Sequence, residues 1–421
     1  MTTLSRTPQI ALFPPAPAAA RAVLALLRNI RHGSLDVRLP AGELLHFGSA
    51  APGEPRATIV LRNWNVCAAA LRSGDIGVAE TFISGDWSTP DITALLTLFT
   101  TNRHDVEAVF HGSWWGSLFY RLRHLLRRNS KNGSKKNIHA HYDLGNNFYR
   151  LWLDPGMNYS SAWFEGDHSG DLSAAQWAKT RRALVECGVR PGDRVLEIGC
   201  GWGALAELAT RDFSARVTGV TLSAEQLAWG RQRLADAGLE ADLRLQDYRD
   251  IDDEPFDAIA SIEMFEAVGR AYWPAFFSTV ARRLKPGGVA CIQSITIRDD
   301  LFERYASSTD FIQQYVFPGG LLPSREEFRV AAAAAGLAVS GEFEFGLDYA
   351  ETLARWRERF LAQDGPVRAL GFDTRFLRIW EFYLAYCQAA FATGNTSVVQ
   401  FTLRHAAAGS ASAASPCDGN R

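Results

Sequence analysis

The stretch Val195–Gly203, which reads VLEIGCGWG, decides the class of fold. A short strand pattern with branched side chains runs into a turn with three glycines, and the helical pattern ALAELAT follows. This is the first strand, turn and helix of a doubly wound fold, where backbone N–H groups at the helix N-terminus approach a ligand. A purely structural turn would use the same glycines. The spacing differs from GxGxxG and no lysine follows, so Glu197 points instead to a ligand that carries an amine or a cation.

The chain after this stretch alternates between strands and helices. The strand patterns are RVTGVTL, DLRLQDY, FDAIASIE and GVACIQSI, and the pattern continues with a strand at 337–345, helices at 349–363 and 374–393, and a last strand at 398–404. Such alternation predicts an α/β fold with a mostly parallel sheet. Ligands bind beyond the carboxyl ends of its strands. The predicted rim therefore contains 199–203, 221–226, 247–249, 263–266 and 293–295.

An aromatic-rich insertion at 301–324 interrupts this pattern. Its aromatic residues either fill a core or line an apolar substrate pocket. They are Phe302, Tyr305, Phe311, Tyr315 and Phe317.

The region before the first strand predicts a small α+β domain. Its strand patterns are SLDVRLP, ELLHFG and RATIVLRN, and helices are expected at 67–72 and 92–100, on either side of GDIGVAETFISGDW. Such a domain serves packing or dimerisation, or it handles lipid. The expected organisation is a flexible segment at 1–34, the small domain at 35–105, a basic amphipathic linker at 106–136, a catalytic domain at 137–404 and a disordered tail at 405–421.

The linker carries the sequence SWWGSLFYRLRHLLRRNSKNGSKK. Tryptophan, leucine and phenylalanine supply an apolar face, while arginine and lysine fill the other side. A basic amphipathic helix with interfacial tryptophan binds anionic membrane surfaces. The alternative is a linker helix that packs on its own domain and exposes its basic face to solvent.

The bulk composition narrows the class of protein further. The chain has 421 residues and a net charge of −2, which argues against general affinity for nucleic acid. Its six cysteines show neither metal nor disulfide spacing, which suits a reducing compartment. Arginines interrupt the apolar segment near the N-terminus, and neither a membrane-spanning helix nor a signal peptide is expected. A cytoplasmic enzyme without a metal site is the resulting expectation.

Several strings together resemble a known family. VLEIGCGWG itself resembles the first motif of S-adenosylmethionine (SAM) methyltransferases, and the others are YDLGNNFY, NYSSAWF, VTGVTLSAEQ, QDYRD, SIEMFEAVG, LKPGG, FPGGLLPS and YAETLARW. Their order is similar to that in cyclopropane-fatty-acyl-phospholipid synthases and related mycolic acid methyltransferases, from about Leu35 onward. The resemblance implies a Rossmann-like seven-stranded SAM methyltransferase fold that methylates double bonds in unsaturated phospholipid acyl chains. It also implies a cytoplasmic protein, peripheral on the inner membrane face, and is compatible with a homodimer.

The resemblance carries the SAM site over residue by residue. The methionine end of SAM would meet Tyr142, Tyr159 and Ser160, and the ribose would meet Thr221, Leu222 and Gln226. Tyr248 and Arg249 would lie at the adenine end. The strand end and turn would add Glu197, Gly199, Cys200, Gly201 and Gly203. Ser223 and Gln226 also form a capping-box pattern that would start the next helix.

The catalytic positions match the family only in part. The family holds a bicarbonate base with Cys, Glu, His, Tyr and an Ile backbone; here Glu266, Ile295 and Tyr349 are present, but Ser161 and Gln293 replace the Cys and the His. Glu263 adds a carboxylate three positions before Glu266. A second negative charge disfavours bicarbonate, and a desolvated Glu can itself act as a base. Proton removal is therefore expected to be rearranged. The expected product is a cyclopropane ring, and the alternative is a methylated alkene, the precursor of methyl-branched or furan fatty acids.

Cys387 matches a cysteine proposed as functional in the family, but no activating base is evident near it in the sequence, and a buried structural role is the favoured interpretation. Two further function classes stay open. One is a SAM methyltransferase for a small amine or hydroxyl substrate, which the aromatic insertion and basic linker disfavour. The other is a lipid-binding protein that has lost its chemistry.

Overall fold

The computed structural model describes residues 16–103 and 144–407, and the chain divides into two compact units. Of the described residues, the first contains 16–103, 308–316 and 371–393, and the second contains the remainder. The predicted linker at 106–136 lies outside the described residues, as does most of the predicted tail. Among the described helices, none has both the length and the apolar character needed to cross a membrane.

A four-stranded sheet forms the centre of the first unit. The strands are β1 (Gly33–Arg38), β2 (Leu44–Ser49), β3 (Arg56–Leu61) and β4 (Trp87–Ser88), in the order β2-β1-β3-β4. The helices α1 (Ala18–Leu27), α2 (Asn65–Ser84) and α3 (Ile92–Thr101) accompany it. The expected strands and the last helix are confirmed.

Two expectations for this unit were wrong. The segment 18–27 is a helix rather than a flexible stretch, because Ala20, Val23, Leu24 and Leu27 lie on one buried face. The predicted helix at 67–72 continues through the motif GDIGVAETFISGDW to Ser84. It bends at Gly74, where φ is 57°, a backbone conformation that glycine adopts without a steric penalty.

Segments from much later in the sequence complete the first unit. These are α13 (Phe311–Tyr315) and α17 (Thr374–Ala392). The ring of Phe382 on α17 lies 5.8 Å from that of Phe82 on α2, and Arg378 donates to the carbonyl oxygen of Phe82 over 3.4 Å. The boundary predicted near residue 105 therefore marks only part of this unit.

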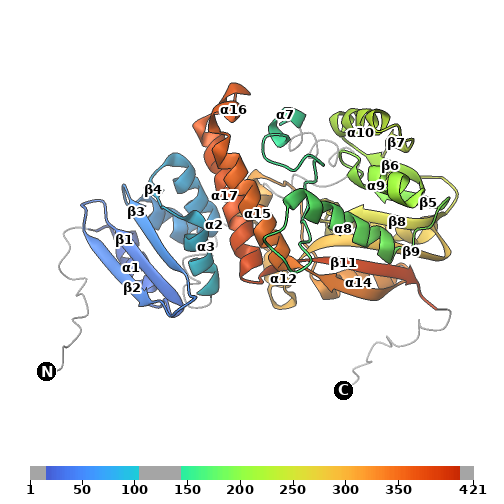
Figure 1. Cartoon of the computed structure of the whole chain (residues 1–421). Helices are drawn as coiled ribbons and strands as arrows, with labels where there is room; N and C mark the ends of the chain where they lie inside the picture. Colours follow the sequence, from blue (N-terminus) through green and yellow to red (C-terminus); the bar gives the residue numbers. More distant parts are fainter. Residues whose placement is uncertain (1–15, 104–143, 408–421) are drawn as a thin grey trace, which may run out of the picture. The chain divides into compact units, whose positions relative to one another are not determined.

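A seven-stranded sheet forms the second unit, in the order β10-β11-β9-β8-β5-β6-β7 (Figure 1). Its strands are β5 (Arg194–Ile198), β6 (Arg216–Thr221), β7 (Asp242–Leu245), β8 (Phe256–Ile262), β9 (Leu284–Ile297), β10 (Leu337–Glu344) and β11 (Thr396–His405). The five strands from β5 to β9 pair in parallel, whereas β11 pairs antiparallel with both β9 and β10. The predicted seven-stranded α/β fold is thus confirmed.

Helices cover both faces of this sheet, with α8 and α14 on opposite sides (Figure 1). The helices are α7 (Asn146–Tyr149), α8 (Leu172–Glu186), α9 (Ala204–Phe213), α10 (Ala224–Asp236), α11 (Trp273–Arg283), α12 (Asp299–Ala306), α14 (Arg325–Ala334), α15 (Gly346–Ala362) and α16 (Asp364–Ala369). The short 3-10 turns are η2 (Tyr248–Asp250), η3 (Phe265–Ala267) and η4 (Arg270–Tyr272). Because both faces are covered, central strands such as β5 are almost fully buried.

Candidate active site

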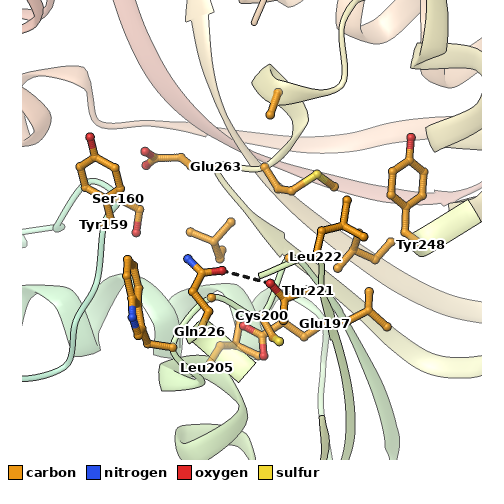
Figure 2. Close-up of a pocket in the computed structure, with 18 of the residues that line it drawn as sticks. Tyr159, Ser160, Glu197, Cys200, Leu205, Thr221, Leu222, Gln226, Tyr248 and Glu263 are labelled. Atoms are coloured by element: carbon orange, nitrogen blue, oxygen red, sulfur yellow. Dashed lines mark hydrogen bonds between the residues drawn. The ribbon is translucent and has the colours of Figure 1, made fainter. Parts of the chain in front are cut away.

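A pocket opens where β5, β6, β7 and β8 end in the second unit (Figure 2). Tyr159, Ser160 and Glu263 lie toward one end of the view, and Leu222 and Tyr248 toward the other. The predicted cofactor residues that line it are Tyr159, Ser160, Glu197, Gly199, Cys200, Gly201, Thr221, Leu222, Gln226, Tyr248 and Arg249. Tyr142 lies outside the described residues. Gly203 is not part of the lining; it is the N-cap residue of α9.

The glycine turn gives the pocket its floor. Gly199 has a φ of 86°, and a Cβ there would meet the side chain of Met264 at 2.8 Å. A larger residue would therefore be strained in its backbone and would displace a side chain that lines the pocket. The glycine at this position is required by both its conformation and its surroundings.

Glu197, near the end of β5, has a carboxyl group that is free to accept a hydrogen bond from a ligand. It is 4% exposed, and its Oε2 atom has no hydrogen-bond partner among the described residues. Burial raises the pKa of this carboxyl well above its usual value. A buried acceptor without a partner costs stability, so a ligand that donates a hydrogen bond at this point would satisfy it. The ribose hydroxyls and the amine of SAM are donors of that kind, and the pocket fits this group.

The loop after β6 holds two of the predicted ribose residues together. The hydroxyl of Thr221 donates to Oε1 of Gln226 over 3.0 Å (Figure 2). The backbone N–H of Gln226 donates to the hydroxyl of Ser223 over 3.2 Å, which caps α10. Only half of the expected capping box therefore forms, because the Gln226 side chain bonds to Thr221 instead of returning to the cap.

At the end of the pocket lined by Tyr248, Arg249 forms a bidentate ion pair with Asp247, with contacts of 2.8 and 2.6 Å. The guanidinium lies 5.6 Å from the ring centres of both Tyr248 and Tyr272. Its charge is thus satisfied within the protein, and burial raises the pKa of Tyr248 to about 12. Tyr248 presents a neutral aromatic ring, which suits a flat base.

The carboxylate of Glu263 accepts hydrogen bonds from three of the predicted catalytic residues. Its Oε1 accepts from the backbone N–H of Ser161 over 2.8 Å and from Nε2 of Gln293 over 2.7 Å. Its Oε2 accepts from the hydroxyl of Tyr349 over 2.7 Å. Burial raises the pKa of Glu263, and these three donors, together with the charge of Lys179, oppose the rise.

Ser161 contributes to this cluster differently from the expectation. Its hydroxyl donates to the carbonyl oxygen of Ala162 over 2.8 Å, and only its backbone N–H reaches Glu263. The side chain at this position is therefore turned away from the acid. The hydrogen bond from the backbone N–H does not depend on the side chain, which explains how serine is accommodated in place of the family cysteine.

The backbone of Glu263 is strained. Its φ is 49°, in the left-handed region that favours glycine, and it directly follows β8. A non-glycine residue costs about 1 kcal/mol or more in this conformation. A glutamate at a position better suited to glycine indicates that its side chain has a use that offsets this cost.

Glu266 lies on η3 and forms a second carboxyl site. Its Oε1 accepts from the backbone N–H of Ile295 and, over 3.0 Å, from the hydroxyl of Ser294, while its Oε2 has no partner among the described residues. Burial and the neighbouring Glu263 raise the pKa of Glu266 to about 8. A pKa near 8 leaves the Glu266 carboxyl mostly protonated at neutral pH, whereas at Glu263 burial raises the pKa and its three donors oppose the rise.

Lys179 on α8 is a functional candidate that the sequence did not reveal. It is 1% exposed, lines the pocket, and donates to the hydroxyl of Ser160 over 2.5 Å. Burial lowers its pKa to about 8, opposed by the nearby charges of Glu263, Asp154 and Glu197. Lys179 therefore brings a basic group into the pocket beside Ser160, the residue that precedes the Ser161 donor to Glu263.

Cys387 and part of the aromatic insertion lie elsewhere. Cys387 belongs to α17 in the first unit, where burial and the charge of Asp310 raise its thiol pKa, so the thiol is not activated as a nucleophile. Phe311 and Tyr315 also belong to the first unit, and the Tyr315 hydroxyl donates to Glu80 over 2.6 Å. Phe302 packs in the core beside Trp273, and the Tyr305 hydroxyl accepts from the backbone N–H of Leu322 over 3.3 Å. The ring of Phe317 lies 6.4 Å from that of Tyr159, which lines the pocket.

Comparisons with known proteins identify the family of the chain. Residues 129–401 match the family model described as mycolic acid cyclopropane synthetase. The tuberculostearic acid methyltransferase of Mycobacterium tuberculosis is 36% identical over 94% of this chain and 95% of its own length. The cyclopropane-fatty-acyl-phospholipid synthase of Escherichia coli is 34% identical over 83% of this chain and 89% of its own. The crystal structure of mycolic acid cyclopropane synthase CmaA1 with SAH and CTAB is 35% identical, with a TM-score of 0.60 over 64% of this chain and 97% of that one.

The fold, the glycine turn and the pocket thus define a SAM-dependent methyltransferase. Within that class, the chain belongs to the mycolic acid cyclopropane synthetase family.

Proposed function

We propose that this enzyme transfers a methyl group from SAM to a carbon of a double bond in an unsaturated acyl chain of a phospholipid, and that Glu263 accepts the proton lost afterwards. When bound, SAM supplies an electrophilic methyl group on a sulfonium. The names of the relatives, which act on fatty acyl and mycolic chains, support a lipid substrate. The cation formed at the neighbouring carbon must lose a proton, and a base is required beside it.

The single observation that carries this proposal is the strained Glu263 with its three donors. The Ser161 N–H, Gln293 and Tyr349 occupy positions that the family resemblance assigns to bicarbonate. Here these donors are engaged by a carboxylate of the chain itself. The Ile295 N–H, another of those positions, is engaged by Glu266. We infer that Glu263 takes the place of bicarbonate, which the enzyme then does not need.

The remaining residues support this acid and base assignment. The protonated Glu266 leaves Glu263 as the charged partner, and a carboxylate near the pocket stabilises the positive charge that develops during transfer. Aromatic rings around Tyr159, including Trp152 and Trp356, exclude water from that end of the pocket. Water would otherwise trap the cation as an alcohol.

We propose a methylated alkene as the product. A tethered carboxylate stays where its donors hold it and takes a proton only from within its reach, and a relative that matches nearly the whole chain is named a methyltransferase. The second candidate is ring closure by loss of a proton from the new methyl group. It is supported by the synthase from Escherichia coli, which matches 83% of the chain.

The test uses the purified enzyme, methyl-labelled SAM and liposomes of unsaturated phospholipid. NMR of the extracted lipid separates the two products, which have equal mass. A labelled methyl group on a retained alkene supports the proposal, whereas high-field cyclopropane protons identify the ring and refute the preferred product. Lipid without label refutes the function itself and favours a small-molecule substrate. Recovery of activity in a liposome pellet tests the further proposal that the enzyme is cytoplasmic and peripheral on the membrane; light scattering tests the proposed homodimer.

A further inference from the structure

A chain of hydrogen bonds leads from Glu263 to the edge of the second unit. Nε2 of Gln293 donates to Glu263, and Oε1 of Gln293 accepts from Nε2 of Gln400 over 3.0 Å. Oε1 of Gln400 in turn accepts from the guanidinium of Arg182 over 2.6 Å. Gln293 on β9 and Gln400 on β11 are directly opposite in the antiparallel register, and they are 0% and 1% exposed. Water therefore has no access with which to satisfy either amide.

The direction of this chain is fixed at Gln400. A guanidinium has only donors, so it must face the oxygen of the Gln400 amide. The amide nitrogen of Gln400 also donates to the carbonyl oxygen of Lys179 over 3.1 Å, and a carbonyl can only accept. Both ends of Gln400 are thus determined independently. Its remaining N–H faces Gln293 and requires an oxygen there.

Arg182 is itself held in place. Its guanidinium carbon lies 3.7 Å from the ring centre of Phe343 and 5.9 Å from that of Trp163. It also pairs with Glu186 one helical turn later, over 3.2 Å. Contacts of this kind limit rotation of a long side chain, so the donor that begins the chain is pre-positioned.

We propose that Gln400, oriented by Arg182 and the Lys179 carbonyl, is a positioning residue that forces Gln293 to present its N–H, rather than its oxygen, to Glu263. A reversed Gln293 would set an oxygen against the carboxylate, and Glu263 would then need a proton to keep the contact. Gln400 therefore keeps the base available at neutral pH without touching it. This inference rests on the proposed role of Glu263.

Other charged and titratable groups also act on Glu263. Lys179 faces it from α8, Tyr349 donates to it from α15, and Glu266 lies beside it on η3; Glu197 on the neighbouring β5 acts on Lys179. A change at Gln400 leaves all of these in place. The test must therefore separate the direction of the amide chain from a simple effect of charge.

The variant Gln400→Glu reverses the chain, because its carboxylate accepts from both Arg182 and Gln293. The acid limb of the kcat–pH profile should move up by about one pH unit or more, which is about a tenfold loss of kcat on that limb. The KM for SAM should stay within about twofold. In a Gln293→Leu background no amide remains to reverse, so the same substitution there measures the charge effect alone. We expect less than about half the shift in that background.

Equal shifts in both backgrounds, or no shift in either, would overturn the inference. Gln400→Met is the second variant in case the buried glutamate prevents folding. It releases Gln293 without adding charge, so it should move the acid limb in the same direction, and an unmoved limb would also overturn the inference. The Glu263→Gln variant separates the two levels: an acid limb that survives in it refutes the base role, whereas a limb that it abolishes but Gln400 variants leave unmoved refutes only the positioning role.

Discussion

The hydroxyl of Tyr349 donates a hydrogen bond to Oε2 of Glu263 over 2.7 Å, although the two residues are 86 positions apart in the sequence. Tyr349 is on the first turn of α15, and Glu263 follows β8. The hydrogen bond joins two distant parts of the second unit at Glu263, the proposed catalytic base. Replacing tyrosine by phenylalanine, which removes only the hydroxyl oxygen, would abolish this hydrogen bond.

Tyr349→Phe should raise the pKa of Glu263, because the variant removes a donor that stabilises the carboxylate. A hydrogen bond to a charged group contributes about 1.5–3 kcal/mol, so the acid limb of kcat should move up by about 1–2 pH units. At high pH the variant should approach the wild-type rate. Tyr315→Phe, which removes a hydroxyl that donates to Glu80 in the first unit, is the matched control. A uniform loss at every pH would contradict the expectation.

Glu263→Gly should create an enzyme that depends on an added anion. Glycine relieves the positive φ and leaves the Ser161 N–H, Gln293 and Tyr349 facing a vacated space. We expect little turnover in bicarbonate-free buffer and a saturable recovery with bicarbonate or formate. Glu263→Gln fills the same space with an amide and serves as the control that should not recover. Rescue of both variants, or of neither, would count against a built-in base.

Glu197→Gln should weaken SAM binding and stabilise the free protein. The substitution keeps the shape of the side chain but replaces one carboxyl oxygen by an amide NH₂ group, which cannot accept a hydrogen bond from SAM, so calorimetry should show a Kd raised by about tenfold. The pKa of Glu197 is raised in the folded state, so its ionisation opposes folding as the pH rises above the unfolded value. The variant should therefore show a higher Tm than wild type at pH 8 without SAM. Glu225→Gln, an exposed change on α10, is the control.

Asp310→Asn should stabilise the protein relative to wild type, and this stabilisation should grow as the pH rises. Burial and the nearby Asp75 raise the pKa of Asp310 to about 7, so its carboxyl favours folding when protonated and loses that contribution between its unfolded value and about pH 7. Asparagine retains the N-cap of α13 and cannot ionise. The Tm difference between variant and wild type should be larger at pH 8 than at pH 4. Asp373→Asn, at the exposed N-cap of α17, should show no such trend.

The sequence predicted the parts of the site that follow local rules. The strand and glycine turn around Glu197, the helix start at Ser223 and the carboxylate of Glu263 were all located from their neighbours in sequence. The family resemblance grouped Ser161, Gln293 and Tyr349 in one site, but spacing alone did not predict that they donate to Glu263, because these donors come from a loop at 161, from β9 and from α15. Their meeting depends on strand order and register, which spacing along the chain does not give.

Lys179 and Gln400 were missed for a different reason. Polar residues on helices and strands are usually solvated, and a pattern search assigns them to the outside. On α8, however, Gln176, Lys179 and Thr180 share the buried face. A polar stripe at spacings of three and four, on the same face as Ala183, was the available signal. It indicates a helix whose inner face supports a site as well as a core.

The participation of α13 and α17 in the first unit determines how the protein can be built. A ribosome emits residues from the N-terminus, so the four strands and first three helices emerge long before Phe382 can pack against Phe82. The first unit must wait, incomplete, until nearly the whole chain has been synthesised, while most of β5 to β9 is already free to assemble. For the same reason, residues 16–103 cannot be cut out and fused to another enzyme as a finished module. The part that is earliest in the gene is among the last to be completed.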